Sequence, residues 1–300
     1  MDISVVVPTL NARDQLACCL DALTDCVPDA ELVVVNGPSS DGTTGMVRER
    51  DDVDVLVELA DRTITVARNA GIDRSTGDVI VFLDHTVTVT PEWAAALERG
   101  LERADLVTGP VATRVNGESV MTAPESRTIA GREVSYFNPG NVAFDRYVLD
   151  ELDGFDEYLH IGGSRDLAHR LAGRSFEVGW EPAMRVSREI GTDGGKRTTD
   201  WGWKYRSLAY RLVKNYNLRP TVARRLLTHA CADSYTELRA VGQGDTRPSE
   251  WLGSGKHVVA NLLGGVKDGF SARRHDRTAR RNPSGRSARA NRAVTVYDWR

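Results

Sequence analysis

Three apolar stretches in the first 86 residues each end in polar side chains that could bind a ligand. The stretches cover residues 3–7, 32–35 and 79–83, and the polar residues behind them include Pro8, Thr9 and Asn11, then Asn36 and Asp41, then Asp84, His85 and Thr86. Amide, hydroxyl and carboxylate groups offer both hydrogen-bond donors and acceptors. Gathered in one place, they would form a site for a polar ligand.

The elements around these residues should bring them together. Unbroken Val, Ile and Leu stretches separated by helical segments are typical of buried parallel strands. The apolar spacing predicts helices over 12–24, 43–50, 63–74 and 91–103, with further strands over 53–57 and 106–111. In such α/β sheets, ligands bind outside the carboxyl ends of the strands, which is where the polar residues fall.

Several motifs in chain order resemble the family 2 glycosyltransferases. The motifs are VVVPTLN, ELVVVNGPSSDGT, ARNAGIDRSTGDVIVFLD, PGNVAF, GFDEYL and RDLAHRL, which together span much of residues 2–215. The resemblance implies an α/β fold of the GT-A class: a Rossmann-like, mixed sheet flanked by helices, as in nucleotide-diphospho-sugar transferases. A C-terminal helical extension should follow it. Fold alone does not establish activity.

The resemblance also implies a nucleotide-sugar donor and the residues that bind it. They are Pro8, Thr9, Asn11, Asn36, Asp41, Arg68, Asn69 and Asp84. Asn36 stands where the family usually has an acid, which changes the hydrogen-bonding groups offered to a base. Arg68 and Asn69 should lie near the base and the phosphates, although an exposed helix position for Arg68 is the alternative.

Asp84 occupies the first position of the family's Asp-x-Asp motif, whose second acid is Thr86 here. Two acids at this place normally hold Mg²⁺ or Mn²⁺ on the donor diphosphate. A later position that is often a metal-binding His reads Ser187. Asp84 is therefore a candidate ligand for a divalent metal whose requirement is in doubt. Three alternatives stay open: Asp84 suffices with substrate and water oxygens, cationic side chains replace part of the metal charge, or transfer is weak.

An inverting transfer to a hydroxyl needs a general base. The resemblance assigns this role to Asp166, with Arg165 in place of the neighbouring Glu, and puts Asn141 and Arg165 on the acceptor side. The alternative for Asp166 is a favourable charge in the first turn of a helix over 163–172.

Charge divides the chain into an acidic body and a basic end. Residues 1–200 contain 35 Asp and Glu against 19 Lys and Arg, whereas residues 201–300 contain 7 against 20. The basic part suggests an anionic partner, with a membrane surface favoured over nucleic acid. Trp201, Trp203, Tyr205 and Tyr210 among basic residues resemble an interfacial helix, and Val258, Val259, Leu262, Leu263 and Val266 form a second apolar stripe. Packing of both helices on the catalytic domain is the alternative.

These observations predict a transferase domain over 1–215, a helical extension over 216–270 and a basic, disordered tail over 271–300. We expect a cytoplasmic enzyme, peripheral on the inner face of the cell membrane if the tail binds lipid. It would transfer sugar to a lipid-linked or other membrane-presented glycan acceptor, with inversion. A catalytically weakened GT-A protein that binds nucleotide, or serves as a partner subunit in glycan assembly, is the alternative.

Overall fold

The structure is a computed structural model that describes residues 1–300 except 116–117, 122, 190–199, 231–247 and 276–292. The chain starts with alternating elements: β1 (Ile3–Thr9), α1 (Arg13–Cys26), β2 (Glu31–Asn36), α2 (Thr43–Arg48), β3 (Val55–Leu59), α3 (Ile64–Arg74) and β4 (Val79–Leu83). β5 (Val87–Thr88), α4 (Trp93–Leu101), β6 (Leu106–Thr108), β7 (Val111–Val115) and β8 (Glu118–Met121) follow. Then come β9 (Glu125–Ile129), β10 (Arg132–Tyr136), β11 (Asn141–Asp145), α5 (Arg146–Glu151), α6 (Gly163–Arg174), β12 (Val178–Trp180) and β13 (Val186–Glu189). α7 (Trp201–Tyr216), a helical segment over 220–230, α9 (Pro248–His275) and β14 (Ala293–Asp298) complete the described elements.

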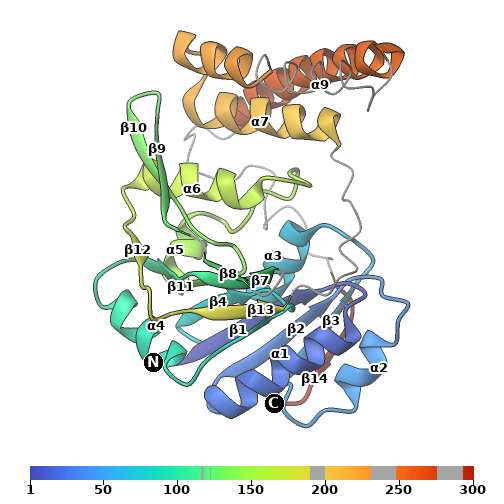
Figure 1. Cartoon of the computed structure of the whole chain (residues 1–300), viewed down its shortest axis with the longest axis vertical. Coiled ribbons are helices and arrows are strands. Elements are labelled where there is room, and N and C mark those ends of the chain that lie inside the picture. The colour runs from blue at the N-terminus through green and yellow to red at the C-terminus, as the bar shows by residue number, and fades with distance from the viewer. Residues whose placement is uncertain (116–117, 122, 190–199, 231–247, 276–292) are drawn as a thin grey trace.

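The main sheet is mixed and has eight strands in the order β12-β6-β11-β4-β1-β2-β3-β14. The four strands β1 to β4 are parallel, whereas β11 runs antiparallel to both β4 and β6. A smaller sheet, β5-β13-β7-β8, lies beside the carboxyl end of β4, and β9 and β10 form a separate hairpin. The mixed α/β sheet flanked by helices confirms the predicted fold class (Figure 1).

Each face of the sheet carries its own apolar core, because successive side chains of a strand point to opposite faces. Val6 packs with α3, α5, α6 and α7 on one face, whereas its neighbours Val5 and Val7 pack with α1 and α4 on the other. All seven residues of β1 are buried. Burial on both faces is the physical reason for the unbroken apolar stretches in the sequence.

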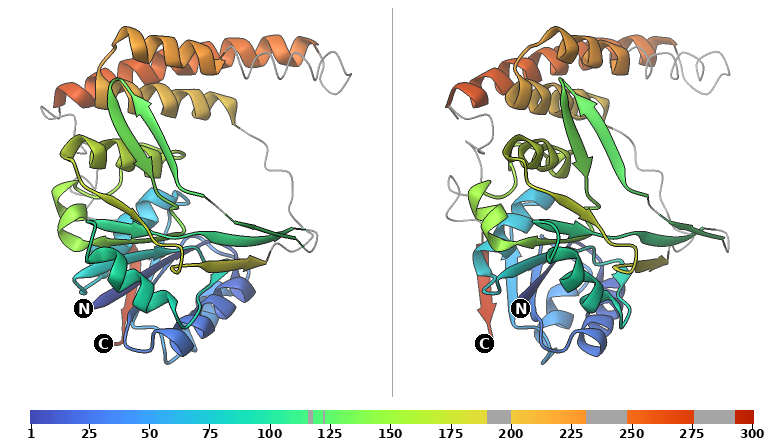
Figure 2. Two further views of the ribbon diagram at one scale, coloured as in Figure 1. Left: turned by 60° about the vertical axis from the view of Figure 1, so that its left-hand side comes forward. Right: turned by 90° about the vertical axis from the view of Figure 1, so that its left-hand side faces the viewer.

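The C-terminal helices lie at one end of the molecule, above α6, and the tip of the β9–β10 hairpin reaches up to their level (Figure 1 and Figure 2). The interfacial helix predicted from the aromatic residues of α7 is wrong for two of them. Tyr205 and Tyr210 are each 1% exposed, and Tyr210 donates a hydrogen bond to Asp156 Oδ2 at 2.8 Å. The half-buried Trp203 stacks on His160. These rings attach α7 to the body of the protein.

The final residues correct the prediction of a disordered tail over 271–300. β14 pairs antiparallel with β3 and forms an edge of the main sheet, and Arg300 Nη1 contacts Glu31 Oε1 at 2.6 Å. Residues 271–275 belong to α9, while 276–292 lie outside the described residues. The chain therefore returns to the domain with which it began. Of the described elements beyond the predicted division at residue 215, the helical segment over 220–230 and α9 lie outside the sheet, whereas β14 belongs to it.

Candidate active site

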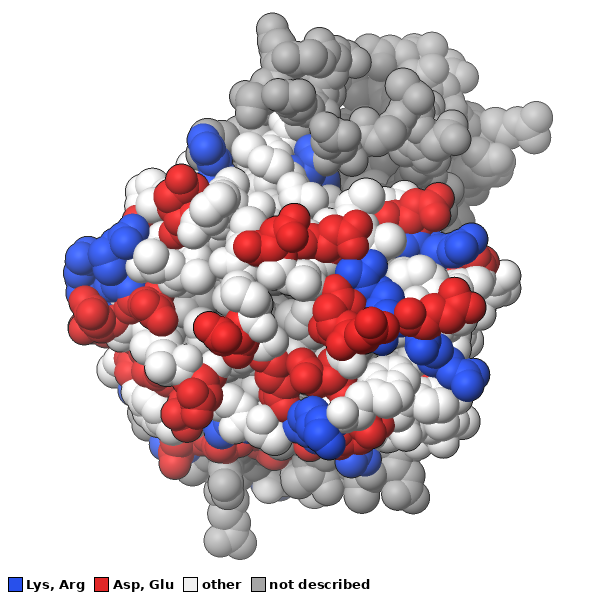
Figure 3. Space-filling model, turned by 90° about the horizontal axis from the view of Figure 1, so that it is seen from below, with Lys and Arg blue, Asp and Glu red and all other residues white. Residues whose placement is uncertain are grey.

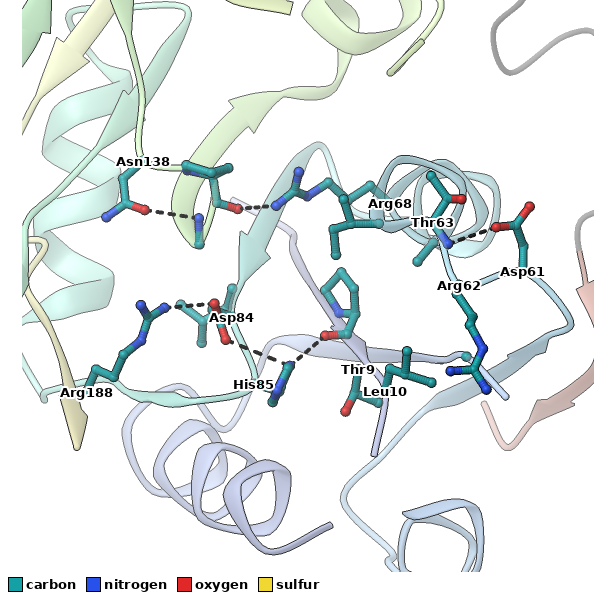
Figure 4. A pocket seen from close by; sticks show the side chains of 17 residues that line it. Thr9, Leu10, Asp61, Arg62, Thr63, Arg68, Asp84, His85, Asn138 and Arg188 are labelled. Carbon is teal, nitrogen blue, oxygen red and sulfur yellow. Dashed lines mark hydrogen bonds and ion pairs between the residues drawn. The ribbon is translucent and has the colours of Figure 1, made fainter. Parts of the chain in front are cut away.

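A cavity of about 430 Å³ lies at the carboxyl ends of β1 to β4, where the sequence placed the site. Four of the predicted donor-binding residues line it: Pro8, Thr9, Arg68 and Asp84. Figure 4 shows how the side chains from β1, α3, the end of β4 and β13 face this space. We call it the first cavity.

Three further predicted residues form hydrogen bonds that hold the loops after β1 and β2 in place. Asn11 Oδ1 accepts a hydrogen bond from the amide of Ser40 at 2.8 Å. Asn36 Nδ2 donates to Thr44 Oγ1 at 2.9 Å, and Asp41 Oδ2 accepts from the amide of Arg13 at 3.0 Å. Asn11, Asn36 and Asp41 do not line the first cavity, so here they shape its rim, and a direct contact with a donor stays a prediction.

Asn69, predicted on the donor side, and Asn141, predicted on the acceptor side, are fully buried and line neither the first cavity nor the second cavity described below, which corrects their expected placement. Asn69 Nδ2 donates to the carbonyl of Phe155 at 2.9 Å, and its Oδ1 accepts from the amide of Phe155 at 2.8 Å. Asn141 Oδ1 accepts from Trp93 Nε1 at 2.9 Å, while its Nδ2 donates to the carbonyl of Met184 at 2.7 Å. Both amides satisfy buried backbone groups, which would otherwise destabilise the fold.

A second cavity of about 630 Å³ adjoins the first and shares Ile64, Arg68, Asn138 and Pro139 with it. Its walls come from the hairpin, the start of α6 and the end of β12, and include Tyr136, His160, Trp180 and the predicted acceptor-side residue Arg165. Arg165 lies over the ring of Tyr136 at 4.1 Å and contacts both carboxylate oxygens of Glu125, at 3.1 and 2.8 Å. Two adjoining cavities can hold two substrates side by side.

Arg68 lies between the two cavities and is 8% exposed. Its Nη2 donates to the carbonyl of Pro139 at 2.8 Å and its Nη1 to Ser164 Oγ at 3.1 Å. Among the described residues it makes no ion pair, and its buried Nε has no hydrogen-bond partner. Burial lowers the pKa of Arg68 to about 10, despite the nearby Asp84, so the side chain is still a cation at neutral pH. The exposed position that was the alternative for Arg68 is therefore excluded.

Asp84 already accepts hydrogen bonds at both of its carboxylate oxygens. Its Oδ1 accepts from the amide and the hydroxyl of Thr86 at 3.0 and 2.8 Å, and its Oδ2 accepts from Arg188 Nη2 at 2.7 Å (Figure 4). Burial favours a raised pKa for Asp84, but His85, Arg188 and Thr86 outweigh it and the pKa is lowered. The carboxylate is therefore ionised and already paired.

These residues do not fit a divalent cation of the kind that an Asp-x-Asp motif holds. Mg²⁺ and Mn²⁺ prefer several hard oxygen ligands. In the described part of the chain, no group of three or more His, Cys, Asp or Glu side chains is placed to hold a metal. His85 uses Nδ1 to donate to the carbonyl of Pro8 at 3.1 Å. Ser187, at the position considered for a metal-binding His, is exposed on β13.

Asp166 lies on the side of α6 that faces α7, away from both cavities, which argues against the predicted role as general base. It is fully buried, and its Oδ2 accepts from Arg170 Nε at 2.9 Å and Lys214 Nζ at 3.2 Å. Its Oδ1 accepts from Asn215 Nδ2 at 2.9 Å. Burial works to raise the pKa of Asp166, but Lys214 and Arg170 hold it well below its usual value. Ser164, two residues earlier and so about 200° around the helix, lines the second cavity instead.

His169 should make folding stability depend on pH. It is 1% exposed, and burial, together with the positive charges of Arg211, Arg225 and Arg165, lowers its pKa to about 3 although Asp166 opposes this. Below a pH of about 6.5 His169 binds a proton in the unfolded chain but stays neutral in the folded chain. The free energy of unfolding therefore falls as the pH falls. In urea unfolding, we expect His169 to contribute a slope that grows from about 0.7 kcal/mol per pH unit at pH 6.5 to about 1.3 kcal/mol per pH unit at pH 5.

The change His169→Gln should remove this slope, and His275→Gln, at an exposed site, should leave it. Both variants and the parent chain can be compared by the pH dependence of their urea midpoints. A parent curve that is flat over this range would contradict a buried neutral His169.

Residues missed by the sequence analysis complete the first cavity: Asp61, Arg62, Thr63, Asn138 and Arg188. Asp61 Oδ1 accepts from the amide of Thr63 at the start of α3, at 2.8 Å. Asp61 follows the carboxyl end of β3, as Asp84 follows that of β4. The rule that ligands bind outside the carboxyl ends of the strands therefore applies to Asp61 as well. The predicted strand over 53–57 ended two residues short of β3, which hid this position.

The comparisons with known proteins agree with this arrangement. Residues 4–153, half of the chain, match the model of glycosyl transferase family 2. The chain belongs to glycosyl transferase family 2. This confirms the resemblance read from the motifs.

Relatives of the chain include two prokaryotic enzymes. Glycosyltransferase AglE of Haloferax volcanii is 32% identical over 143 residues, covering 45% of each chain. Undecaprenyl-phosphate mannosyltransferase of Micrococcus luteus is 30% identical over 212 residues, covering 64% of this chain and 86% of that protein. The matches span less than half of the length of each of the first relatives.

Two solved structures share the GT-A fold. Staphylococcus aureus TarS 1–349, in complex with UDP-GlcNAc, superposes with a TM-score of 0.59 at 15% identity and covers 92% of both chains. Mannosyltransferase PcManGT of Pyrobaculum calidifontis, in complex with GDP-Man and Mn²⁺, gives a TM-score of 0.51 at 16% identity, with 89% of this chain and 86% of that chain covered. These likenesses establish the architecture.

Proposed function

We propose that the chain transfers a sugar from a nucleotide-sugar to a phosphate-bearing lipid acceptor, with inversion. The donor would bind in the first cavity and the acceptor in the second. The observation that supports this most strongly is the continuity of the two cavities through Arg68, which can contact ligands in both. Similar proteins support the substrate classes, since TarS and PcManGT are described with UDP-GlcNAc and GDP-Man, and one relative is named an undecaprenyl-phosphate mannosyltransferase.

The surroundings of the second cavity favour an anionic acceptor. Arg165 lines it, and Arg211 lies beside Gly162 of its wall, where an added Cβ would meet Arg211 Nη1 at 2.5 Å. Burial lowers the pKa of Arg211 to about 10, and among the described residues Arg211 makes no ion pair. A phosphate would supply negative charge and several acceptor oxygens to these guanidinium groups.

An acceptor phosphate would also explain why the second cavity has few side chains that could act as a general base. Glu125 is the only acidic side chain among the described residues that line the second cavity, and hydrogen bonds from Arg165 lower the pKa of Glu125. Asp166 is buried in ion pairs. A hydroxyl acceptor would need a general base, whereas a phosphate monoester is mostly ionised at neutral pH, with a second pKa of about 6. Its oxygen can attack the anomeric carbon without one.

The test is a transfer assay with UDP- and GDP-sugars and a short polyprenyl phosphate, beside the matching polyprenol without phosphate. We expect a lipid-linked sugar with the phosphate and none with the alcohol, and NMR should show that the anomeric configuration is inverted. Transfer to the alcohol alone would overturn the acceptor class. Failure of every nucleotide-sugar to be consumed would overturn the donor class.

A second candidate function is nucleotide binding without turnover, in a partner subunit of a glycan-assembly system. The burial of Asp166 favours it, because this residue was the expected base. Binding of nucleotide-sugars with no transfer to any phosphate or hydroxyl acceptor would decide for this candidate.

The proposed acceptor requires a membrane surface, and α9 offers a face for it. None of the described helices is long and apolar enough to cross a membrane. The outer side of α9 exposes Val259, Leu263 and Phe270, by 58%, 62% and 38%, at helical spacing. Lys256, Lys267 and Arg274 are exposed on the same helix. We place this face against anionic lipid at the inner side of the cell membrane.

On the lower face of the molecule, on the far side from α7 and α9, acidic side chains outnumber basic ones (Figure 3). Reversing the charge of Lys256, Lys267 and Arg274 to Glu should weaken binding to anionic vesicles by roughly 100-fold or more at low salt, at about 1 kcal/mol for each lost cation. A matched triple reversal at exposed Arg13, Arg99 and Arg103 should not weaken it. Equal loss in both triples, measured by vesicle sedimentation, would contradict a role for α9.

A further inference from the structure

Arg188 is fixed at the edge of the first cavity by strands on both sides. It lies on β13, which pairs with β7 on one side and with β5 on the other, where Arg188 is opposite Val87. β5 begins three residues after Asp84, so the strand pairing itself brings Arg188 to the end of β4. The 2.7 Å contact between Arg188 Nη2 and Asp84 Oδ2 then orients the guanidinium over the cavity (Figure 4).

The guanidinium of Arg188 has N–H groups that remain available to donate to a ligand. Asp84 takes a hydrogen bond from Nη2, and the buried Nε has no partner in the structure. The Nε of Arg68, on the other side of the cavity, is also buried and has no hydrogen-bond partner in the structure. Each Arg fork can bind two oxygens of a phosphate, and both cations are partly or fully removed from water, where such contacts are stronger.

The charges of the first cavity are suited to an anion. Its lining includes Arg62, Arg68 and Arg188 against Asp61 and Asp84. Asp84 is neutralised by Arg188, and Asp61 accepts the amide of Thr63. A nucleoside diphosphate would meet guanidinium groups in this cavity, whereas the fold relative PcManGT is described in complex with GDP-Man and Mn²⁺.

We propose that Arg188 takes the place of a divalent cation, and that the chain binds the donor diphosphate with Arg188 and Arg68 in the absence of metal. The inference rests on the proposed function. In transfer, a bond forms between an acceptor phosphate oxygen and the anomeric carbon, and the bond from that carbon to the β-phosphate oxygen breaks. The electron pair stays on the departing diphosphate, and Arg188 stabilises its charge by hydrogen bonds without losing a proton. Asp84 acts as a positioning residue for Arg188.

The experiment is calorimetric titration of the full chain with UDP and with GDP, in EDTA and in MnCl₂. We expect at least one nucleotide to bind equally well in both buffers, within about twofold. Arg188→Gln should weaken that binding in EDTA by roughly 10- to 100-fold, because a hydrogen bond to a charged group is lost. Arg188→Lys should retain part of the affinity, since it keeps the charge but not the fork.

Arg185→Gln is the matched control, because it removes the same charge from an exposed residue near the start of β13, and it should bind as the parent does. Affinity of the parent that rises tenfold or more with Mn²⁺ would overturn the inference and leave the proposed function standing. Unchanged binding by Arg188→Gln would also overturn it. If neither nucleotide binds the parent in either buffer, the proposed function itself fails.

Discussion

The change Asp166→Asn should lower the free energy of unfolding by about 3 kcal/mol, the lower end of the effect of breaking a buried ion pair. Asp166 balances both Arg170 and Lys214 within hydrogen-bond distance, and all three side chains are fully buried. Asparagine keeps the shape and loses the charge, which leaves Arg170 without an acidic partner among the described residues. Lys214 keeps Asp156, at 2.5 Å, and this is why we expect the lower end.

Urea unfolding at pH 7 measures this, with Asp14→Asn as the control, because Asp14 is an exposed acid in the first turn of α1. The control should change stability by less than about 0.5 kcal/mol. Since the pKa of Asp166 is lowered by folding, its contribution is present at neutral pH and is lost as the pH falls below about 4. Unchanged stability of Asp166→Asn, together with a loss of transfer, would restore the catalytic role.

The change Arg68→Met should have the opposite character: a large loss of donor binding with little change in stability. Arg68 is a buried cation without an ion-pair partner among the described residues, and its desolvation opposes folding. An apolar side chain of similar size removes that cost, which offsets the loss of its bonds to Pro139 and Ser164. Donor binding should fall by roughly 100-fold, because a charged contact is removed from a site shielded from water.

Thermal melting and calorimetry with UDP or GDP give the two readouts, and Arg99→Met, on the exposed side of α4, is the control for both. Arg68→Lys should recover part of the binding. Severe destabilisation of Arg68→Met with unchanged affinity would show that Arg68 serves the fold and not the ligand.

The sequence was sufficient for the parallel strands β1 to β4 and for the edge of the sheet where the cavity lies. Unbroken apolar stretches identify strands buried on both faces, and the carboxyl ends of parallel strands meet at one edge. Pro8, Thr9 and Asp84 were found in this way. β14 was missed although Val294, Thr295, Val296 and Tyr297 are strong strand formers, because its pairing partner β3 lies at the far end of the chain and cannot be identified from the local sequence.

Other residues were misplaced because residue type does not show which way a side chain faces. Asn69 and Asn141 have the polar groups of ligand-binding residues, but the same groups satisfy buried backbone. For Asp166 a signal was present: Arg170 follows at i+4, the spacing of a helical ion pair. Arg188 gave none, because its approach to Asp84 depends on the pairing of β13 with β5.

Hydrogen exchange measured by mass spectrometry tests most directly the claim that a nucleotide-sugar binds at the first cavity. In the presence of a donor that shows binding, UDP-GlcNAc or GDP-mannose being the first to try, peptides containing residues 8–10, 61–68, 84–86 and 138–140 should exchange more slowly. Peptides from α9, far from the cavity, should not change. Protection confined to other segments, or none at saturating donor, would contradict the account.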